Sequence, residues 1–164
     1  MSKFLSLACV CAGSLSWAGA ALAKASQEQP IDFATQIQPI FDQKCAFSGC
    51  HAGASPQQGM SLAAGKSYDA IVNAPSQEAP SVMRVKPSDA ENSYLYRKLE
   101  GEQTDLGGSG GRMPLGKPTL AEDQIKLIEA WINQGALKEP PPPPTAVEAS
   151  AWGQVKRLVE EWVK

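Results

Sequence analysis

The only histidine of this 164-residue chain directly follows a cysteine, in the segment Cys45-Ala46-Phe47-Ser48-Gly49-Cys50-His51. Two of the four cysteines and the one imidazole therefore lie within a single short stretch of sequence. A single histidine excludes metal sites that need several imidazoles, and it makes Ser-His-Asp or Cys-His catalysis depend on His51 alone. The fold must therefore be one that keeps Cys45, Cys50 and His51 together on one loop.

Residues 1–23 have the pattern of a cleaved signal peptide. A short positive start, Met1-Ser2-Lys3, precedes the uncharged run 4–20, and Ala21-Leu22-Ala23 has the A-x-A form of a cleavage site. We expect cleavage after this site and export to the periplasm or another oxidising compartment, with an uncleaved anchor as the alternative. The two cysteines of the signal segment are then lost, and the two that remain enter a compartment where unused thiols do not stay free.

Apolar residues recur with helical spacing along the rest of the chain, and no segment has a convincing strand pattern, so we predict an all-α protein. The expected order is a polar lead-in (24–31), a helical domain (32–138), a polyproline linker (139–145) and an amphipathic helix (146–164). Five consecutive prolines in the linker form a stiff spacer. The net charge of −2, without clusters of Lys and Arg, argues against nucleic acid binding.

Four helices are predicted in the domain, over residues 32–44, 67–72, 88–100 and 119–134. Ser67 is expected to cap the second helix, and capping boxes are expected at Ser88-Asp89-Ala90-Glu91 and Thr119-Leu120-Ala121-Glu122. Glycines follow the third and fourth helices and are expected to end them. The glycine-rich run 107–111 matches neither a P-loop nor a dinucleotide fingerprint, because no strand precedes it, and it is predicted to be a flexible loop.

The Cys45–His51 segment has the arrangement that covalent haem attachment requires. Two cysteines on one loop can form thioethers with the two vinyl groups of a porphyrin, and the histidine that follows is carried under the iron. The usual spacing leaves two residues between the cysteines, whereas here there are four, and Gly49 helps the longer loop to turn. The alternatives are a Cys45–Cys50 disulfide and a dithiol redox catalyst. Zinc lacks a fourth ligand.

Methionine is a common sixth ligand of haem iron, and three methionines follow the signal segment. Met113 is the predicted ligand, because Pro114 stiffens an extended loop that can present it from the opposite face. Met60 and Met83 are interpreted as packing residues, and Arg112 is a candidate partner of a haem propionate, with a solvated arginine as the alternative. Further apolar residues are expected to pack on the porphyrin or its helices: Phe41, Leu62, Tyr68, Leu95, Leu99, Leu115, Ile128 and Trp131.

The chain resembles a class I cytochrome c in its Cys50-His51 pair, in Met113-Pro114 and in the closing segment Trp131–Ala136. The segments Ile37-Gln38-Pro39-Ile40-Phe41, Gly59-Met60-Ser61-Leu62, Val85-Lys86-Pro87-Ser88-Asp89, Ser93-Tyr94-Leu95 and Arg112-Met113-Pro114 are similar to planctomycete-type cytochrome c domains. The likeness covers about residues 31–137. It implies one covalent haem c with His51 as proximal and Met113 as distal ligand, in an exported electron carrier or an electron-transfer module. The chain departs from the family in its C-x4-C-H spacing and in Ala52, where a glycine is usual.

The expected function is single-electron transfer to redox protein partners by a monohaem cytochrome c that is not an enzyme. One alternative is an electron-transfer subunit of a dehydrogenase or oxidase complex, docked through residues 146–164, which could also contact a membrane surface or fold back on the domain. A haem peroxidase with an open sixth position is another. A haem-free binding domain stabilised by a disulfide is the last.

Overall fold

A computed structural model describes residues 29–142, 153–156, 158, 159 and 161. Within these residues the chain is helical and forms no strand, only three isolated β-bridges, which confirms the all-α prediction. The predicted signal peptide, most of the polar lead-in and parts of the linker and of the C-terminal segment lie outside the described residues. No helix within the described part is both long and apolar enough to span a membrane.

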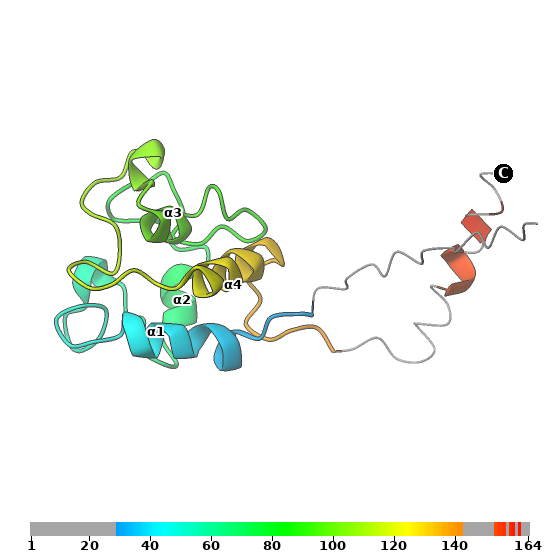
Figure 1. The fold of residues 1–164 in the computed structure, drawn as a ribbon, viewed down its shortest axis with the longest axis horizontal. Coiled ribbons are helices and arrows are strands. Elements are labelled where there is room, and N and C mark those ends of the chain that lie inside the picture. Colours follow the sequence, from blue (N-terminus) through cyan, green and yellow to red (C-terminus); the bar gives the residue numbers. More distant parts are fainter. Residues whose placement is uncertain (1–28, 143–152, 157, 160, 162–164) are drawn as a thin grey trace, which may run out of the picture.

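Seven helical elements make up the domain (Figure 1). In chain order they are the π-helix η1 (Phe33–Ile37), α1 (Gln38–Lys44), the 3-10 turn η2 (Gln57–Gly59), α2 (Ser67–Ile71), α3 (Tyr94–Glu100), the 3-10 turn η3 (Gln103–Leu106) and α4 (Glu122–Asn133). Irregular chain joins them, as the many Gly and Pro residues predict. The predicted first helix is thus a π-turn followed by an α-helix with Pro39 in its first turn.

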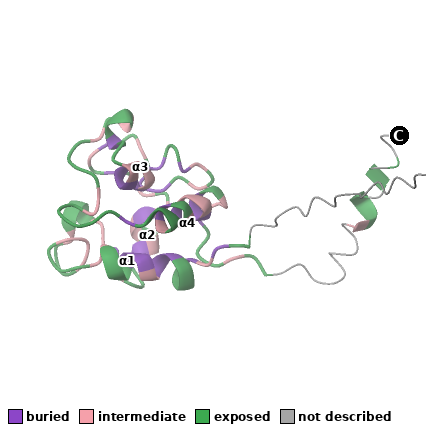
Figure 2. Ribbon diagram, in the orientation of Figure 1, coloured by how far each residue is buried: buried purple, intermediate pink, exposed green. Residues whose placement is uncertain are grey.

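The core combines buried side chains from η1, α1, α2, α3 and α4. Figure 2 marks buried stretches in the four α-helices. The centre of the core is aromatic: the Phe33 ring lies 5.1 Å from the Trp131 ring and 5.3 Å from the Tyr68 ring, centroid to centroid. Trp131 is 1% exposed, and its indole N–H donates to the Leu137 carbonyl at 2.8 Å. The buried residues of α4 are Ile125, Ile128, Trp131 and Ile132, which share one helical face, as the spacing of apolar residues in the predicted helix 119–134 leads us to expect.

The predicted start of the third helix is wrong. Ser88 has φ +64°, and the Asp89 carboxylate accepts from both the backbone and the side-chain nitrogens of Asn92, which makes a local turn. Asp and Asn side chains compete in this way with helical hydrogen bonds. The helix begins at Tyr94, with Ser93 as its N-cap, and ends as expected at Gly101.

The caps predicted for the second and fourth helices are also wrong. Ser67 is the first helical residue, and its buried hydroxyl donates to the side chain of Gln38. The fourth helix starts at Glu122 after Ala121, whose N–H donates to the Gln124 side chain. Leu120 and Ile125 on either side of this start are both buried, at the spacing of a hydrophobic staple, which sets the start later than Thr119 predicts.

Candidate functional site

A cavity of about 480 Å³ opens beside the core. The residues predicted to form the thioethers and to ligate the iron, Cys45, Cys50, His51 and Met113, all line it. One side, the His51 wall, is formed by residues 41–62 and carries Cys45, Cys50 and His51. The facing side, the Met113 wall, is formed by α3 and residues 110–120. Of the apolar residues expected near the porphyrin, five line the cavity: Phe41, Leu62, Leu95, Leu99 and Leu115.

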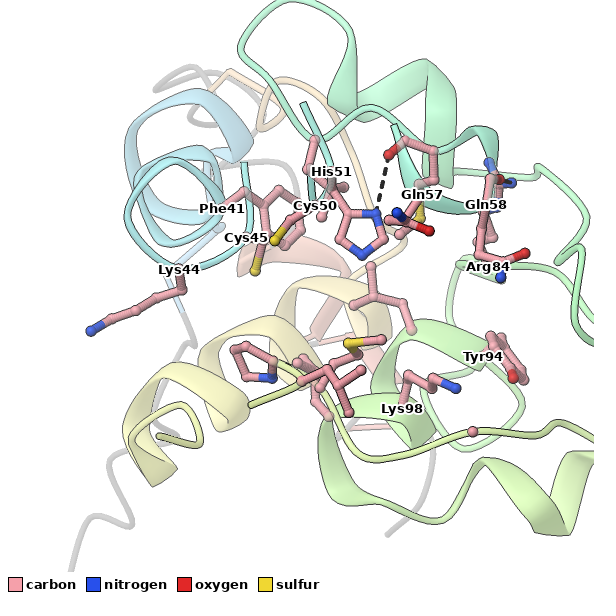
Figure 3. Close-up of a pocket in the computed structure, with 18 of the residues that line it drawn as sticks. Phe41, Lys44, Cys45, Cys50, His51, Gln57, Gln58, Arg84, Tyr94 and Lys98 are labelled. Atoms are coloured by element: carbon pink, nitrogen blue, oxygen red, sulfur yellow. Dashed lines mark hydrogen bonds between the residues drawn. The ribbon is translucent and has the colours of Figure 1, made fainter. Parts of the chain in front are cut away.

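The His51 ring is held by a backbone carbonyl. Its Nδ1 lies 3.3 Å from the Met60 oxygen (Figure 3). Because a carbonyl only accepts, Nδ1 carries the proton and Nε2 keeps its lone pair. Burial lowers the pKa of the imidazole, although the Met60 carbonyl partly offsets this, so the ring is neutral at pH 7. A neutral imidazole fixed through Nδ1 is the form in which histidine binds metals.

Backbone hydrogen bonds close the four-residue loop between the cysteines. The Cys50 N–H donates to the Phe47 carbonyl at 3.0 Å, and the His51 N–H donates to the Cys45 carbonyl at 3.3 Å. Gly49 has φ +81°, which only glycine adopts without strain. Both thiols are free and half-buried, and burial raises the pKa of the Cys45 thiol to about 11. The unusual spacing thus still brings two thiols and the imidazole onto one wall.

Met113 is half-buried in the facing wall, and its N–H donates to the Lys98 carbonyl at 2.9 Å. Lys98 lies across the cavity from His51 (Figure 3). Met60 also lines the cavity, but it lies on the His51 wall, to which its carbonyl contributes. Met83 is 39% exposed and lies outside the lining. Of the three methionines, Met113 is therefore the one that faces His51.

The structure does not bring Arg112 into the cavity. It is exposed, and its Nε donates to the Leu99 carbonyl. Arg84, which sequence reasoning missed, lines the cavity instead, at the end away from the two cysteines (Figure 3). Its only sequence signal is a charge between the apolar residues Met83 and Val85.

The Arg84 side chain is buried, at 9% exposure, and donates to the carbonyls of Ala70 and Gln58, both at 2.7 Å. Within the described residues no carboxylate lies within ion-pair distance of its guanidinium. Burial lowers its pKa, but an arginine stays charged at neutral pH. A buried cation without a counter-charge is costly, so this end of the cavity favours an anionic group.

The described residues hold no cluster of three His, Cys, Asp or Glu side chains that could bind a metal ion by themselves. The cavity instead combines two thiols, a neutral imidazole, two thioethers, apolar walls and two buried cations, Arg84 and Lys98, of which Lys98 is paired with Glu78. Comparisons with models of known protein families, with characterised proteins and with solved structures give no match for this chain.

Proposed function

We propose that this protein is an exported monohaem c-type cytochrome that transfers single electrons, with a class I cytochrome c-like domain at residues 32–138. The proposal depends mainly on how the His51 side chain is held. Its Nδ1 is used by the Met60 carbonyl, and its free Nε2 belongs to a cavity wall that also holds both thiols. Met113 on the facing wall supplies the soft ligand typical of electron-transfer cytochromes.

The residues around the cavity fit a haem c. The thiols of Cys45 and Cys50 lie at one end, where thioether bonds to the vinyl groups would form, and Arg84 lies at the other, where a propionate carboxylate would supply the missing counter-charge. Apolar side chains such as Phe41 and Leu95 line the space between them. The cavity volume is in the range of pockets that bind organic cofactors.

A bound haem would supply reversible one-electron chemistry at its iron. His51 would hold it from one side as a neutral imidazole, and Met113 from the other as a thioether. Because both positions are then taken by the protein, no coordination site is left for a substrate, which favours a carrier over an enzyme. Export through the signal segment 1–23 would place this carrier in the periplasm, among redox protein partners.

Haem staining after denaturing electrophoresis tests the proposal, because only thioether-bound haem stays with the chain. We expect the full-length protein, expressed with the cytochrome c maturation apparatus, to stain, and the Cys45→Ser/Cys50→Ser double variant not to stain. An unstained wild-type protein would contradict the proposal, and a Cys45–Cys50 disulfide in that protein would support the haem-free domain instead.

A second candidate function is that of an electron-transfer subunit docked to a larger oxidoreductase. Residues 153–156, 158, 159 and 161 are helical, and Val155, Leu158 and Val159 expose apolar side chains there. Exposed apolar groups on one helix favour a partner surface. Deletion of residues 146–164 should then abolish co-purification of a partner while the haem spectrum and the unfolding temperature stay unchanged. A large loss of stability would show that the segment packs on its own domain.

A further inference from the structure

The glycine loop, residues 107–111, leads directly into Arg112 and Met113, and it lies against α3. A Cβ at Gly108 would be 2.3 Å from the Tyr94 Oη, closer than real atoms approach, and a Cβ at Gly110 would be 3.3 Å from the Lys98 Nζ. A side chain at Gly108 would therefore push the loop away from the helix, and one at Gly110 would crowd the Lys98 amine. The glycines let the loop backbone approach α3 closely. The sequence alone predicts only that the loop is flexible.

A buried polar cluster lies under this loop. The Lys98 Nζ is 2.8 Å from the Glu78 Oε2 and donates to the Ser109 carbonyl at 2.5 Å. The Tyr94 hydroxyl donates to the same Glu78 oxygen at 2.5 Å. Lys98 and Tyr94 are 7% and 6% exposed. We call Glu78, Tyr94 and Lys98 the Glu78 cluster. Buried ion pairs of this kind are expensive to break, because the remaining charge has no partner.

Lys98 holds the chain at two points. Its side chain binds the loop at Ser109, and its carbonyl accepts from the N–H of Met113. Gln103 adds a third tie, donating from Nε2 to the Gly110 carbonyl at 2.6 Å. Four of the five residues of the glycine loop have no side chain, and Leu115 beyond it is 68% exposed, so apolar packing contributes little here. The position of the glycine loop, which leads into Met113, therefore depends on these polar contacts.

We propose that Glu78, Tyr94 and Lys98 are positioning residues that fix the glycine loop on α3 and so hold Met113 toward His51, which rests on the proposed role of Met113 as distal ligand. Glu78 acts from outside α3 and neutralises Lys98, so that Lys98 can remain buried beside the loop. Tyr94 orients the Glu78 carboxylate. None of the three residues is required to bind the iron.

The test compares Glu78→Gln with Glu122→Gln in the full-length protein. Glu122 forms an exposed ion pair with Lys126 on α4, so the control makes the same chemical change at a site far less buried. We expect Glu78→Gln to keep its haem stain but to raise amide hydrogen exchange in residues 107–113 about 10- to 100-fold, as expected for loss of a charged hydrogen bond. The reduced Glu78→Gln protein should also bind carbon monoxide about tenfold faster, as expected if Met113 leaves the iron more often. The control should match the wild type in both measurements.

Tyr94→Phe removes one donor and keeps the ring, and it serves as the readout should Glu78→Gln fail to fold. It should raise exchange and carbon monoxide binding by a smaller factor, about threefold to tenfold. Haem-stained variants with wild-type exchange in residues 107–113 and wild-type carbon monoxide binding would overturn the role of the cluster. A wild-type protein without haem stain would instead refute the cytochrome proposal, and exchange in the loop would still report whether the cluster holds it.

Discussion

The His51 wall comes from one stretch of chain, residues 41–62, whereas the Met113 wall combines α3 with residues 110–120 and is held by contacts with Glu78 and the glycine loop. The hydrogen bonds of the His51 wall join residues that are close in sequence: Cys45 with Phe41, His51 with Cys45, and His51 with Met60. The hydrogen bonds that hold the Met113 wall join residues farther apart in sequence, such as Glu78 with Lys98 and Met113 with Lys98. Both walls line one cavity, but they are specified in different ways.

This difference has a physical consequence. Local backbone bonds form with little loss of chain entropy, so the His51 wall depends on few other parts of the fold. The Met113 wall forms only after the segment around Glu78 and the glycine loop have both reached α3. Substitution of Cys45, Cys50 or His51 on the His51 wall should therefore weaken or remove attachment of the proposed cofactor, whereas substitutions on the Met113 wall should loosen one ligand and leave the cofactor attached.

His51→Ala should have the largest effect. It removes the only imidazole of the chain, so we expect haem-stained protein to fall more than about tenfold relative to total protein. Gln57→Ala is the matched control, since Gln57 is an exposed residue of the same wall whose side chain donates to the Gly49 carbonyl. Wild-type yield with an unchanged visible spectrum in His51→Ala would show that His51 is not a ligand.

Arg84→Gln should have the next largest effect, because Arg84 joins the two walls. Its side chain binds the Gln58 carbonyl in the His51 wall, and its own carbonyl accepts from the Leu95 N–H in α3. We expect a loss of about 2–3 kcal/mol in the free energy of unfolding, from carbonyls left without a charged donor. Arg112→Gln is the control and should cost less than about 1 kcal/mol, since its side chain is exposed. Equal losses in urea unfolding would contradict the assignment of Arg84 to the cavity.

Arg84 and Arg112 also show which parts of the site can be predicted from the sequence. Helical spacing of apolar residues correctly predicts helices at α1 and α4, because that spacing repeats within a few residues. The cysteines and His51 were found for the same reason, since their chemistry lies in adjacent positions. Arg112 is a candidate on sequence grounds because it is next to Met113, but side chains at adjacent positions of an extended chain point to opposite sides. Arg84 reaches the cavity only through the folding of residues 73–87.

The wrong helix starts have a similar cause. A capping box is a pattern of residue types, and Ser88-Asp89-Ala90-Glu91 satisfies it, yet the same Asp89 can bind Asn92 and form a turn. Ser93 favours the turn over the capped helix. Its hydroxyl accepts from the Lys86 N–H and donates to the Asp89 carbonyl. The competition is thus settled by further hydrogen bonds, which a four-residue pattern of residue types does not contain.

Met113→Ala should distinguish the role of the Met113 wall from that of the His51 wall. We expect haem to stay attached through the thiols while the reduced protein binds carbon monoxide readily, because the distal ligand is gone. The free energy of unfolding should fall by about 1–2 kcal/mol, below the cost in a full core, since Met113 is half-buried. Met83→Ala, outside the cavity, should change neither carbon monoxide binding nor the spectrum. An unchanged spectrum in Met113→Ala would instead favour an open site, as in a peroxidase.

The smallest effect is expected where the chain that follows Met113 reaches back to the His51 wall. The Lys117 Nζ lies 3.7 Å from the centroid of the Phe47 ring, which stands between the two cysteines in sequence. A cation over an exposed aromatic ring contributes about 0.5–1 kcal/mol, so a double-mutant cycle with Lys117→Met and Phe47→Leu should give a coupling free energy of that size in thermal unfolding. The same cycle with Lys126→Met, whose lysine pairs with Glu122, should give none. If the Lys117 cycle also gives no coupling, the two walls are joined at Arg84 and not at the cysteine edge of the cavity.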